Sequence, residues 1–158
     1  PYTTLFRSTE HGHQFRLTNM QAALGVGQVN RIESIVERKR WAAAEYTKRL
    51  SDLTQLQLPI ELPWARSVFW VYGMVLANDV AFDATEFGNR LKGLGIETRP
   101  FFLGMHEQPV FHDMGLFKGE SYPVSERIAR RGLYVPSGLA LTLEQIDTVS
   151  QAVRKALR

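Results

Sequence analysis

Apolar residues in the first third of the chain recur at the spacing of one helix face. These positions are Val29, Ile32, Val36, Ala43, Tyr46 and Leu50, with charged residues between them. Thr18 and Gln21 precede them as a capping box, in which the threonine hydroxyl accepts from the third backbone N–H and the glutamine reaches back. The pattern therefore predicts one long helix from Thr18 to Leu50, with its charged residues on the solvated side.

A run of β-branched and aromatic residues predicts the first strand. Residues 68–76 carry apolar side chains on both faces, which is typical of a strand that is covered on both sides. Trp70 and Tyr72 are accordingly interpreted as core residues. A second strand is expected over 96–102, where Pro100 favours a position at the edge of the sheet or at a bulge.

Capping and breaking residues divide the rest of the chain into short elements. The expected elements are a helix between Asp83 and Gly95, a loop over 103–121, a helix between Pro123 and Gly132, a strand at 133–135 and a final helix capped by Thr142 and Gln145. The alternation of helices and strands predicts an α/β fold with a small domain of α+β type. In this fold one long helix leads into a small sheet with helices packed on it.

Composition sets limits on the class of protein. The chain has 158 residues, of which 44% are hydrophobic and 22% charged, and these values exclude disordered and fibrous proteins. It contains no cysteine, which excludes disulfides and thiolate chemistry and is typical of a reducing compartment. No apolar run approaches the ~18 residues of a membrane span. The formal net charge of +3 is mildly basic and indicates little about partners. We expect neither a nucleic acid nor a membrane as a partner, and we expect a cytoplasmic location.

The first eight residues do not resemble a natural segment. Pro1–Ser8 resembles the translation of a sequencing-library adapter, so we expect the natural sequence to begin near Thr9. A native surface arm is the alternative. The rest of the chain is divided into a helical part (9–50), a connector (51–66) and a small C-terminal domain (67–158).

No complete catalytic set is recognisable in the sequence. His11 and His13 lack carboxylate or thiolate partners at ligand spacing, so no metal is expected. The cations between Arg31 and Arg40 alternate with glutamates and indicate a solvated helix face rather than a nucleic-acid surface. Residues 12–19 place amide, arginine and hydroxyl groups just before a helix N-terminus, which suits an anion such as phosphate.

A second group of candidate residues follows the end of the second expected strand. Arg99, Phe101 and His106 combine a cation, an aromatic ring and an imidazole within a few positions. Binding residues are frequent in loops that a rigid sheet positions. A purely structural role for each residue remains the alternative.

Several short motifs occur in a fixed order along the chain. They are Gly12–Asn19, then Gln21-Ala22-Ala23-Leu24-Gly25 and Gln28, Arg38 with Tyr46 and Leu50, Phe69-Trp70-Val71-Tyr72, Gly95-Ile96, and Arg131-Gly132-Leu133 with Pro136. In this order they resemble the region after the active-site lysine in the DegT/DnrJ/StrS family of pyridoxal-phosphate sugar aminotransferases. The run 95–102 with Met105 and His106 is most similar to the perosamine synthase branch, which aminates a GDP-linked 4-keto-6-deoxymannose.

The resemblance implies that the chain is the C-terminal part of a fold type I transferase. Residues 9–50 would then be the end of the large domain and the connecting helix, and 67–158 the small domain. The implied cofactor is pyridoxal 5'-phosphate, held as a Schiff base by a lysine in an upstream Ser-x-x-x-Lys setting, and the implied amino donor is glutamate. No lysine of the chain lies in that setting. The chain therefore has no catalytic residue of its own and is expected to be inactive by itself.

The resemblance also assigns binding residues and a partner. Gln14, at the position of the family's asparagine, would contact the cofactor phosphate of the partner subunit in a homodimer. Arg16 would contact the same phosphate or hold the loop. Arg99, Phe101 and His106 would line the pocket for the nucleotide-sugar substrate. Loss of the large domain would leave an extensive apolar surface exposed.

Two other functions remain open at this point. The chain could be an inactive, stand-alone binding module that kept only the small domain. It could also derive from a sugar dehydratase of the same superfamily, in which a histidine replaces the cofactor lysine. The resemblance also implies that the sugars made by the intact enzyme enter surface polysaccharide or O-antigen.

Overall fold

The computed structural model of the chain describes residues 15–158. Residues 1–14, with the adapter-like segment, both N-terminal histidines and Gln14, lie outside them, so the predictions about these positions stay untested. The chain divides into two units, one that ends at Glu33 and one over Ser34–Arg158. Each unit is described by itself.

The first unit contains helix α1 (Asn19–Val29), which the sequence delimits well at its start. Thr18 Oγ1 accepts from the Gln21 N–H at 3.3 Å, and Gln21 Oε1 accepts from the Thr18 N–H at 2.9 Å, as the capping box predicts. At the other end, the N–H of Asn30 bonds back to carbonyls of the last turn. None of the residues of α1 is buried.

The expected single helix over 18–50 is wrong. A turn at Asn30 and Arg31 separates α1 from helix α2 (Ile32–Leu50). The apolar residues at this turn are not buried, and Val29 is 67% exposed. Most helical stability comes from the packing of an apolar face, and α1 gains none of it, so periodicity alone does not keep the helix continuous.

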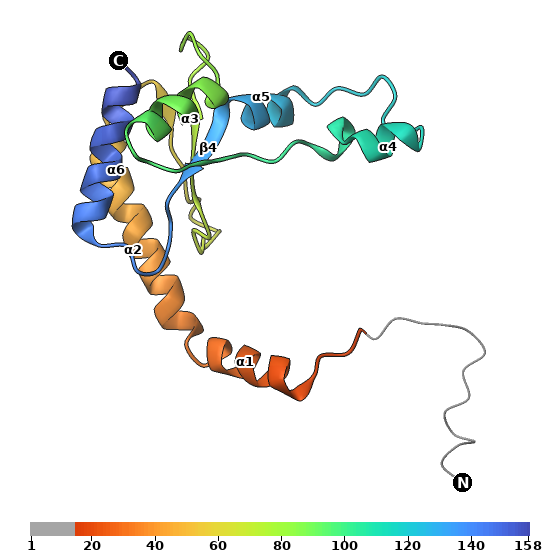
Figure 1. The fold of residues 1–158 in the computed structure, drawn as a ribbon, viewed down its shortest axis with the longest axis vertical. Helices are drawn as coiled ribbons and strands as arrows, with labels where there is room; N and C mark the ends of the chain where they lie inside the picture. Colours follow the sequence, from red (N-terminus) through yellow and green to blue (C-terminus); the bar gives the residue numbers. More distant parts are fainter. Residues whose placement is uncertain (1–14) are drawn as a thin grey trace. The chain divides into compact units, whose positions relative to one another are not determined.

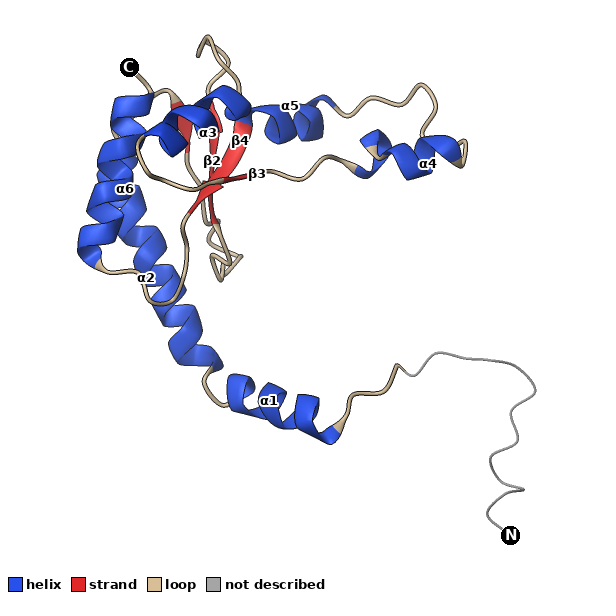
Figure 2. Ribbon diagram, viewed as in Figure 1, coloured by secondary structure: helices blue, strands red, loops and turns tan. Residues whose placement is uncertain are grey.

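The second unit is built on an antiparallel sheet of four strands (Figure 2). In spatial order the strands are β1 (Leu56–Gln57), β2 (Tyr72–Leu76), β4 (Gly132–Val135) and β3 (Arg99–Pro100). Tyr72 pairs with Val135 across β2 and β4, and Arg99 pairs with Tyr134 across β3 and β4. β3 is an edge strand, as Pro100 predicts, because proline has no N–H to donate to a neighbouring strand.

Helices cover one face of this sheet and enclose the core. Helices α2, α3 (Ala84–Gly93) and α6 (Leu143–Ala156) supply the helical side, and the α2 and α6 ribbons run close to each other in Figure 1. The largest fully buried side chains are Tyr46, Tyr72, Phe87, Leu50, Met74, Leu76, Leu91, Leu133, Ile146, Val135 and Val153. The rings of Tyr46 and Tyr72 stack with their centroids 5.0 Å apart. These contacts join α2 to the sheet.

The helices of the small domain begin at the residues that the sequence indicates. Asp83 Oδ1 accepts from the N–H of Glu86 at 2.9 Å before α3, and Thr142 forms a capping box with Gln145 before α6. Helix α5 (Pro123–Arg131) begins at its proline. The α/β fold class is therefore confirmed, with helices packed on a small sheet.

The expected strand over 68–76 is longer than the strand that forms. Only Tyr72–Leu76 pairs, because Phe69 has φ 45°, a left-handed backbone conformation that an extended strand cannot contain. Tyr72 is 2% exposed, which confirms its interpretation as a core residue. Trp70 is 66% exposed, so the same interpretation is wrong for it.

Several short elements differ from the sequence-based expectation. The expected strand over 96–102 is reduced to Arg99–Pro100, and β1 lies inside the expected connector 51–66. Two short helices, η2 (Met105–Glu107) and α4 (Pro109–Asp113), lie in the expected loop. Elements of two to five residues are too short to show a periodic pattern.

The sheet face that lies away from the core helices carries the candidate residues. We call it the open face. Gly73, Tyr134 and Arg99 share it, since residues paired across antiparallel strands point to the same side. From β3 the chain leaves the sheet in a long excursion, residues 103–121, which we call the arm; α4 lies near its far end (Figure 1).

Candidate functional site

The residues assigned to the substrate pocket line three different cavities. Arg99 lines a cavity of about 420 Å³ that Val135 and Pro136 also line. Phe101 lines a cavity of about 470 Å³, and His106 lines one of about 640 Å³ at the arm. The structure of this chain thus does not bring the three side chains into one pocket.

The cavity at Arg99 combines two cationic side chains. Arg99 is exposed and lies opposite Tyr134 on the open face. Lys39 of α2 lines the same cavity and donates to the carbonyl oxygen of Trp70 at 2.9 Å and to that of Ser137. Burial lowers the pKa of Lys39, because desolvation disfavours the charged form. An arginine and a lysine in one cavity can bind an anionic group.

Phe101 packs on the sheet and shapes its open face. A Cβ on Gly73 would lie 2.5 Å from Phe101 Cζ, and a Cβ on Gly132 would also collide with the phenylalanine ring. The centroid of the ring lies 6.0 Å from that of Tyr134. Glycines on two neighbouring strands therefore leave the space that the ring occupies. This contact favours the structural role of Phe101.

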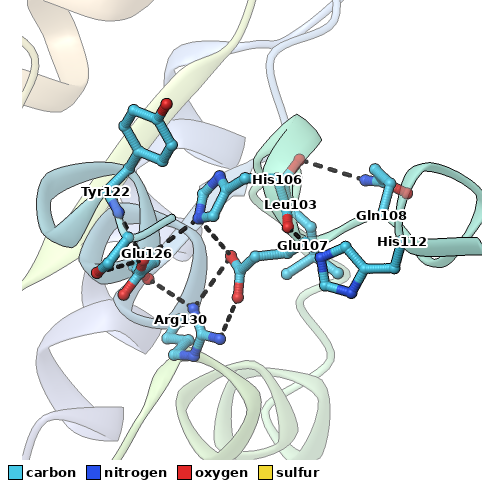
Figure 3. A network of polar contacts seen from close by, with 9 residues as sticks. Leu103, His106, Glu107, Gln108, His112, Tyr122, Glu126 and Arg130 are labelled. Carbon is cyan, nitrogen blue, oxygen red and sulfur yellow. Dashed lines mark hydrogen bonds and ion pairs between the residues drawn. The ribbon is translucent and has the colours of Figure 1, made fainter. Parts of the chain in front are cut away.

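His106 connects the arm to α5 (Figure 3). It is 8% exposed, its Nε2 lies 3.3 Å from Glu126 Oε1, and its ring centroid lies 4.8 Å from that of Tyr122. Its carbonyl oxygen accepts from His112 within the arm. The buried imidazole thus contacts Glu126 and Tyr122, and the backbone of the same residue bonds to His112, which links the base of the arm to α5.

Glu126 receives three donors on one oxygen atom. Its Oε1 accepts from the Tyr122 N–H at 2.7 Å and from Ser121 Oγ at 3.1 Å, in addition to its contact with His106 (Figure 3). These bonds lower the pKa of Glu126, and the bond from the Tyr122 N–H has the largest effect. An ionised carboxylate in the first helical turn is also favoured by the helix dipole. Glu126 therefore fixes both ends of the arm.

A second link between the arm and α5 is more exposed. The guanidinium of Arg130 donates to both carboxylate oxygens of Glu107 and lowers the pKa of that carboxyl. The arginine side chain is 56% exposed, and such surface pairs contribute little to stability. Two contacts thus hold the arm against α5, that of His106 with Glu126 and that of Glu107 with Arg130.

Only part of the assigned cofactor site falls within the described residues. Arg16 is exposed and lies just before the start of α1. A guanidinium can bind a phosphate with two hydrogen bonds, and the first N–H groups of a helix also favour an anion, so this residue fits the assigned role. Gln14 lies outside the described residues.

Two other features, a metal centre and a membrane-spanning helix, are not found among residues 15–158. Within this range, no three histidine or carboxylate side chains gather where they could hold a metal ion. None of the helices in the same range combines the length and the apolar character that a membrane crossing requires.

Sequence reasoning missed several residues that shape these cavities. Glu126 carries a local signal, an acidic residue shortly after the helix-opening Pro123, that could have identified it. Lys39 carries none, since its acceptors at Trp70 and Ser137 lie 31 and 98 positions away in sequence. The sequence pattern includes Lys39 in the solvated face of its helix. The exposure of Trp70 depends on the backbone at the preceding residue.

The curated proteins that are similar to this chain are named as enzymes that modify sugars. A GDP-perosamine synthase of Escherichia coli O157:H7 is 30% identical over 145 residues, which are 91% of this chain and 37% of the relative. A dTDP-4-dehydro-2,6-dideoxy-D-glucose 3-dehydratase of Saccharopolyspora spinosa is 24% identical over 143 residues, 90% of this chain and 31% of the relative. The chain thus spans about a third of the length of these relatives.

Solved structures and a family model agree with this similarity. The crystal structure of the aminotransferase TlmJ from Streptoalloteichus hindustanus matches 96% of this chain and 40% of its own, with a TM-score of 0.80 and 26% identity. The model of the DegT/DnrJ/EryC1/StrS aminotransferase family matches residues 2–154. This match covers nearly the whole sequence, together with its cap, turn and strand motifs, and the chain therefore belongs to the DegT/DnrJ/EryC1/StrS aminotransferase family.

Proposed function

We propose that this chain is the C-terminal part of a pyridoxal-phosphate-dependent enzyme that aminates a nucleotide-linked 4-keto-6-deoxy sugar, with glutamate as the amino donor. The observation that carries the proposal is the family match over residues 2–154. The similarity to a GDP-perosamine synthase over 91% of the chain supports a GDP-linked sugar. The intact polypeptide, not this segment alone, has the activity.

The chain supplies the small domain and the segment before it. Its lysines lie on helices or in the arm, and none lies in the Ser-x-x-x-Lys setting, so the chain by itself is inactive. Pyridoxal phosphate, when bound, carries the amino group between donor and acceptor. In the homodimer, Gln14 and Arg16 hold the cofactor phosphate of the partner subunit.

Of the three residues assigned to the substrate pocket, one contacts the substrate and the other two hold the surrounding chain in position. Arg99 is exposed in a cavity that it shares with Lys39, and its guanidinium binds an anionic part of the nucleotide sugar. Phe101 holds the end of β3 against the sheet by packing over Gly73. His106 holds the arm against α5. Both of these residues thus act through the chain segment that follows Arg99.

One alternative rests on a specific observation. The similarity to a sugar 3-dehydratase covers 90% of the chain, so the same small domain serves both kinds of reaction. The difference lies in whether the intact protein carries lysine or histidine at the cofactor position. The stand-alone binding module is the other alternative, and it is favoured by the enclosed core of residues 34–158.

The experiment is to recover the natural reading frame around this segment, express it, and incubate it with pyridoxal phosphate, glutamate and GDP-4-keto-6-deoxymannose. We expect 2-oxoglutarate and a GDP-linked 4-amino sugar in equal amounts. The matched control replaces the lysine upstream of Gly12 with alanine, and it should form neither product. Loss of the 3-hydroxyl without amine formation would identify the dehydratase. A native start codon before Pro1 would favour the binding module.

A further inference from the structure

A further cavity, of about 280 Å³, lies between α3 and β3, on the helix-covered side of the sheet. Pro100 lines it and is paired with Leu133, which belongs to the buried core, whereas Arg99 is paired with Tyr134 on the open face. The strand β3 therefore divides this cavity, which we call the α3 cavity, from the cavity of Arg99.

Polar side chains from two segments of the chain converge on the α3 cavity. Thr85, Asn89 and Lys92 lie on one face of α3, because residues three or four positions apart share a helix face. Glu97 and Thr98 line the cavity from the segment that leads into β3. The lining thus contains an ammonium, a carboxylate, an amide and two hydroxyl groups.

A glycine leaves room between the two segments. A Cβ on Gly88 of α3 would lie 3.2 Å from Thr98 Oγ1, so any larger residue would narrow the cavity. Ala84, Pro100 and Leu133 add an apolar part to the lining. A hollow with a partly apolar lining and a few converging polar groups is typical of a site for a small molecule.

The two charged groups of the cavity have opposite signs and are not paired. Over the part of the chain that the structure describes, neither the ammonium of Lys92 nor the carboxylate of Glu97 takes part in a hydrogen bond or an ion pair. On the same helix, Arg90 does pair with Glu86, at 2.9 Å. An unpaired cation and an unpaired anion that line one cavity suit a ligand that carries both charges.

We propose that the α3 cavity binds a free α-amino acid, with the carboxylate of the ligand at Lys92 and its ammonium group at Glu97. The amide of Asn89 and the hydroxyls of Thr85 and Thr98 can each donate and accept further hydrogen bonds. Pockets for drug-sized ligands measure roughly 300–1,000 Å³, so a volume of about 280 Å³ favours a smaller molecule. A simple anion would be repelled by Glu97 and a simple cation by Lys92. The inference goes beyond the proposed function and does not depend on it.

The test is a titration of the isotope-labelled chain with L-serine, followed by the amide chemical shifts. We expect saturable shifts around Thr85, Asn89 and Thr98 and none in α6. Because Lys92 and Glu97 are exposed, binding should be in the millimolar range. Acetate and methylamine, which each carry one of the two charges, are the matched ligands and should bind about fivefold more weakly than L-serine.

Two variants assign the charges of the ligand to the two sides of the cavity. Lys92→Gln and Glu97→Gln should each weaken L-serine binding about fivefold. Lys92→Gln should weaken the binding of acetate and not of methylamine, and Glu97→Gln should do the reverse. Lys48→Gln and Glu37→Gln, at exposed positions of α2, are the matched controls and should leave L-serine binding unchanged.

Three results would overturn the inference. They are absence of L-serine binding, shifts centred outside the α3 cavity, and equal L-serine affinity of both site variants and the unsubstituted chain. Thermal unfolding checks that each variant is folded. If a site variant does not fold, the comparison of the three ligands on the unsubstituted chain decides, and acetate or methylamine binding as tightly as L-serine would refute recognition of both charges.

Discussion

Single residues determine where the aromatic rings of the open face lie. Gly73 and Gly132 have no side chain, and Phe101 occupies the space above them. In the same way, the left-handed backbone of Phe69 leaves Trp70 exposed. At this scale the shape of the candidate site depends on a few positions where backbone and side chain compete for the same space.

Gly73→Ala should destabilise the second unit. The new Cβ would lie 2.5 Å from Phe101 Cζ, so the ring must move, and overpacking of this kind is unfavourable by about 1–3 kcal/mol. Urea unfolding followed by circular dichroism measures the loss. Gly138→Ala is the control, because a Cβ at Gly138 meets no atom within 4 Å. Adding Phe101→Leu to Gly73→Ala should recover part of the stability; equal stability of Gly73→Ala and the unsubstituted chain would contradict this account of the ring.

His106→Leu should loosen the arm while the core stays folded. The substitution keeps an apolar side chain at a buried position and removes the contact with Glu126, which is worth about 1 kcal/mol for an average hydrogen bond. We expect amide hydrogen exchange over 103–121 to become several times faster and exchange in α6 to stay the same. Lys118→Met, at an exposed position of the arm, serves as the control. Unchanged exchange in the arm would show that His106 does not hold it.

At the scale of elements, short segments with little core of their own are fixed by side-chain contacts to helices. Glu126 binds the ends of the arm to α5. Glu61 does the same for the segment before β2, because it accepts from Arg40 of α2 at 2.6 and 2.9 Å and from the N–H of Ser67 at 2.7 Å. These contacts position the residues that line the cavities.

The hydrogen bonds of Glu61 predict that the stability of the second unit depends on pH. Two hydrogen bonds lower the pKa of Glu61 from 4.5 to about 2. The bond from Arg40 has the largest effect, and the bond from the N–H of Ser67 has the second largest. Because the folded-state pKa is the lower one, its contribution to stability is complete above pH 4.5 and is lost as the pH falls towards 2. Chemical unfolding between pH 7 and 2 should show the Glu61→Gln variant as less stable than the unsubstituted chain at neutral pH. The two stabilities should converge near pH 2, and a constant difference across the range would refute the link.

For the whole molecule, the main feature is apolar surface that the chain does not bury. In α1, Met20 is 81% exposed and Leu24 is 72% exposed, and no residue of this helix is buried. Soluble monomers seldom leave adjacent apolar side chains so exposed. Their exposure supports the proposed homodimer and the proposal that the chain is part of a larger protein.

Leu24→Glu should weaken self-association of the chain. Burial of an apolar side chain in an interface contributes about 1.5–3 kcal/mol, and a buried unpaired carboxylate opposes association further. Sedimentation velocity over a range of concentrations should show association of the unsubstituted chain and a dissociation constant at least about tenfold higher for the variant. Lys48→Gln, on the exposed side of α2, is the control, because it lowers the net charge by the same one unit. A monomer at every concentration would contradict the proposed association.

Local signals in the sequence determined the family motifs, the starts of α1, α3, α5 and α6, and the edge position of β3. Each of these depends on groups within a few positions, such as Thr142 capping the N–H of Gln145. The tertiary structure alone decided that the first helix breaks at Asn30, that Trp70 is exposed, and that Arg99 and His106 line separate cavities. These outcomes depend on long-range packing and on the direction in which each side chain leaves the backbone. Periodicity encodes neither, because partners such as Lys39 and Ser137 are 98 positions apart.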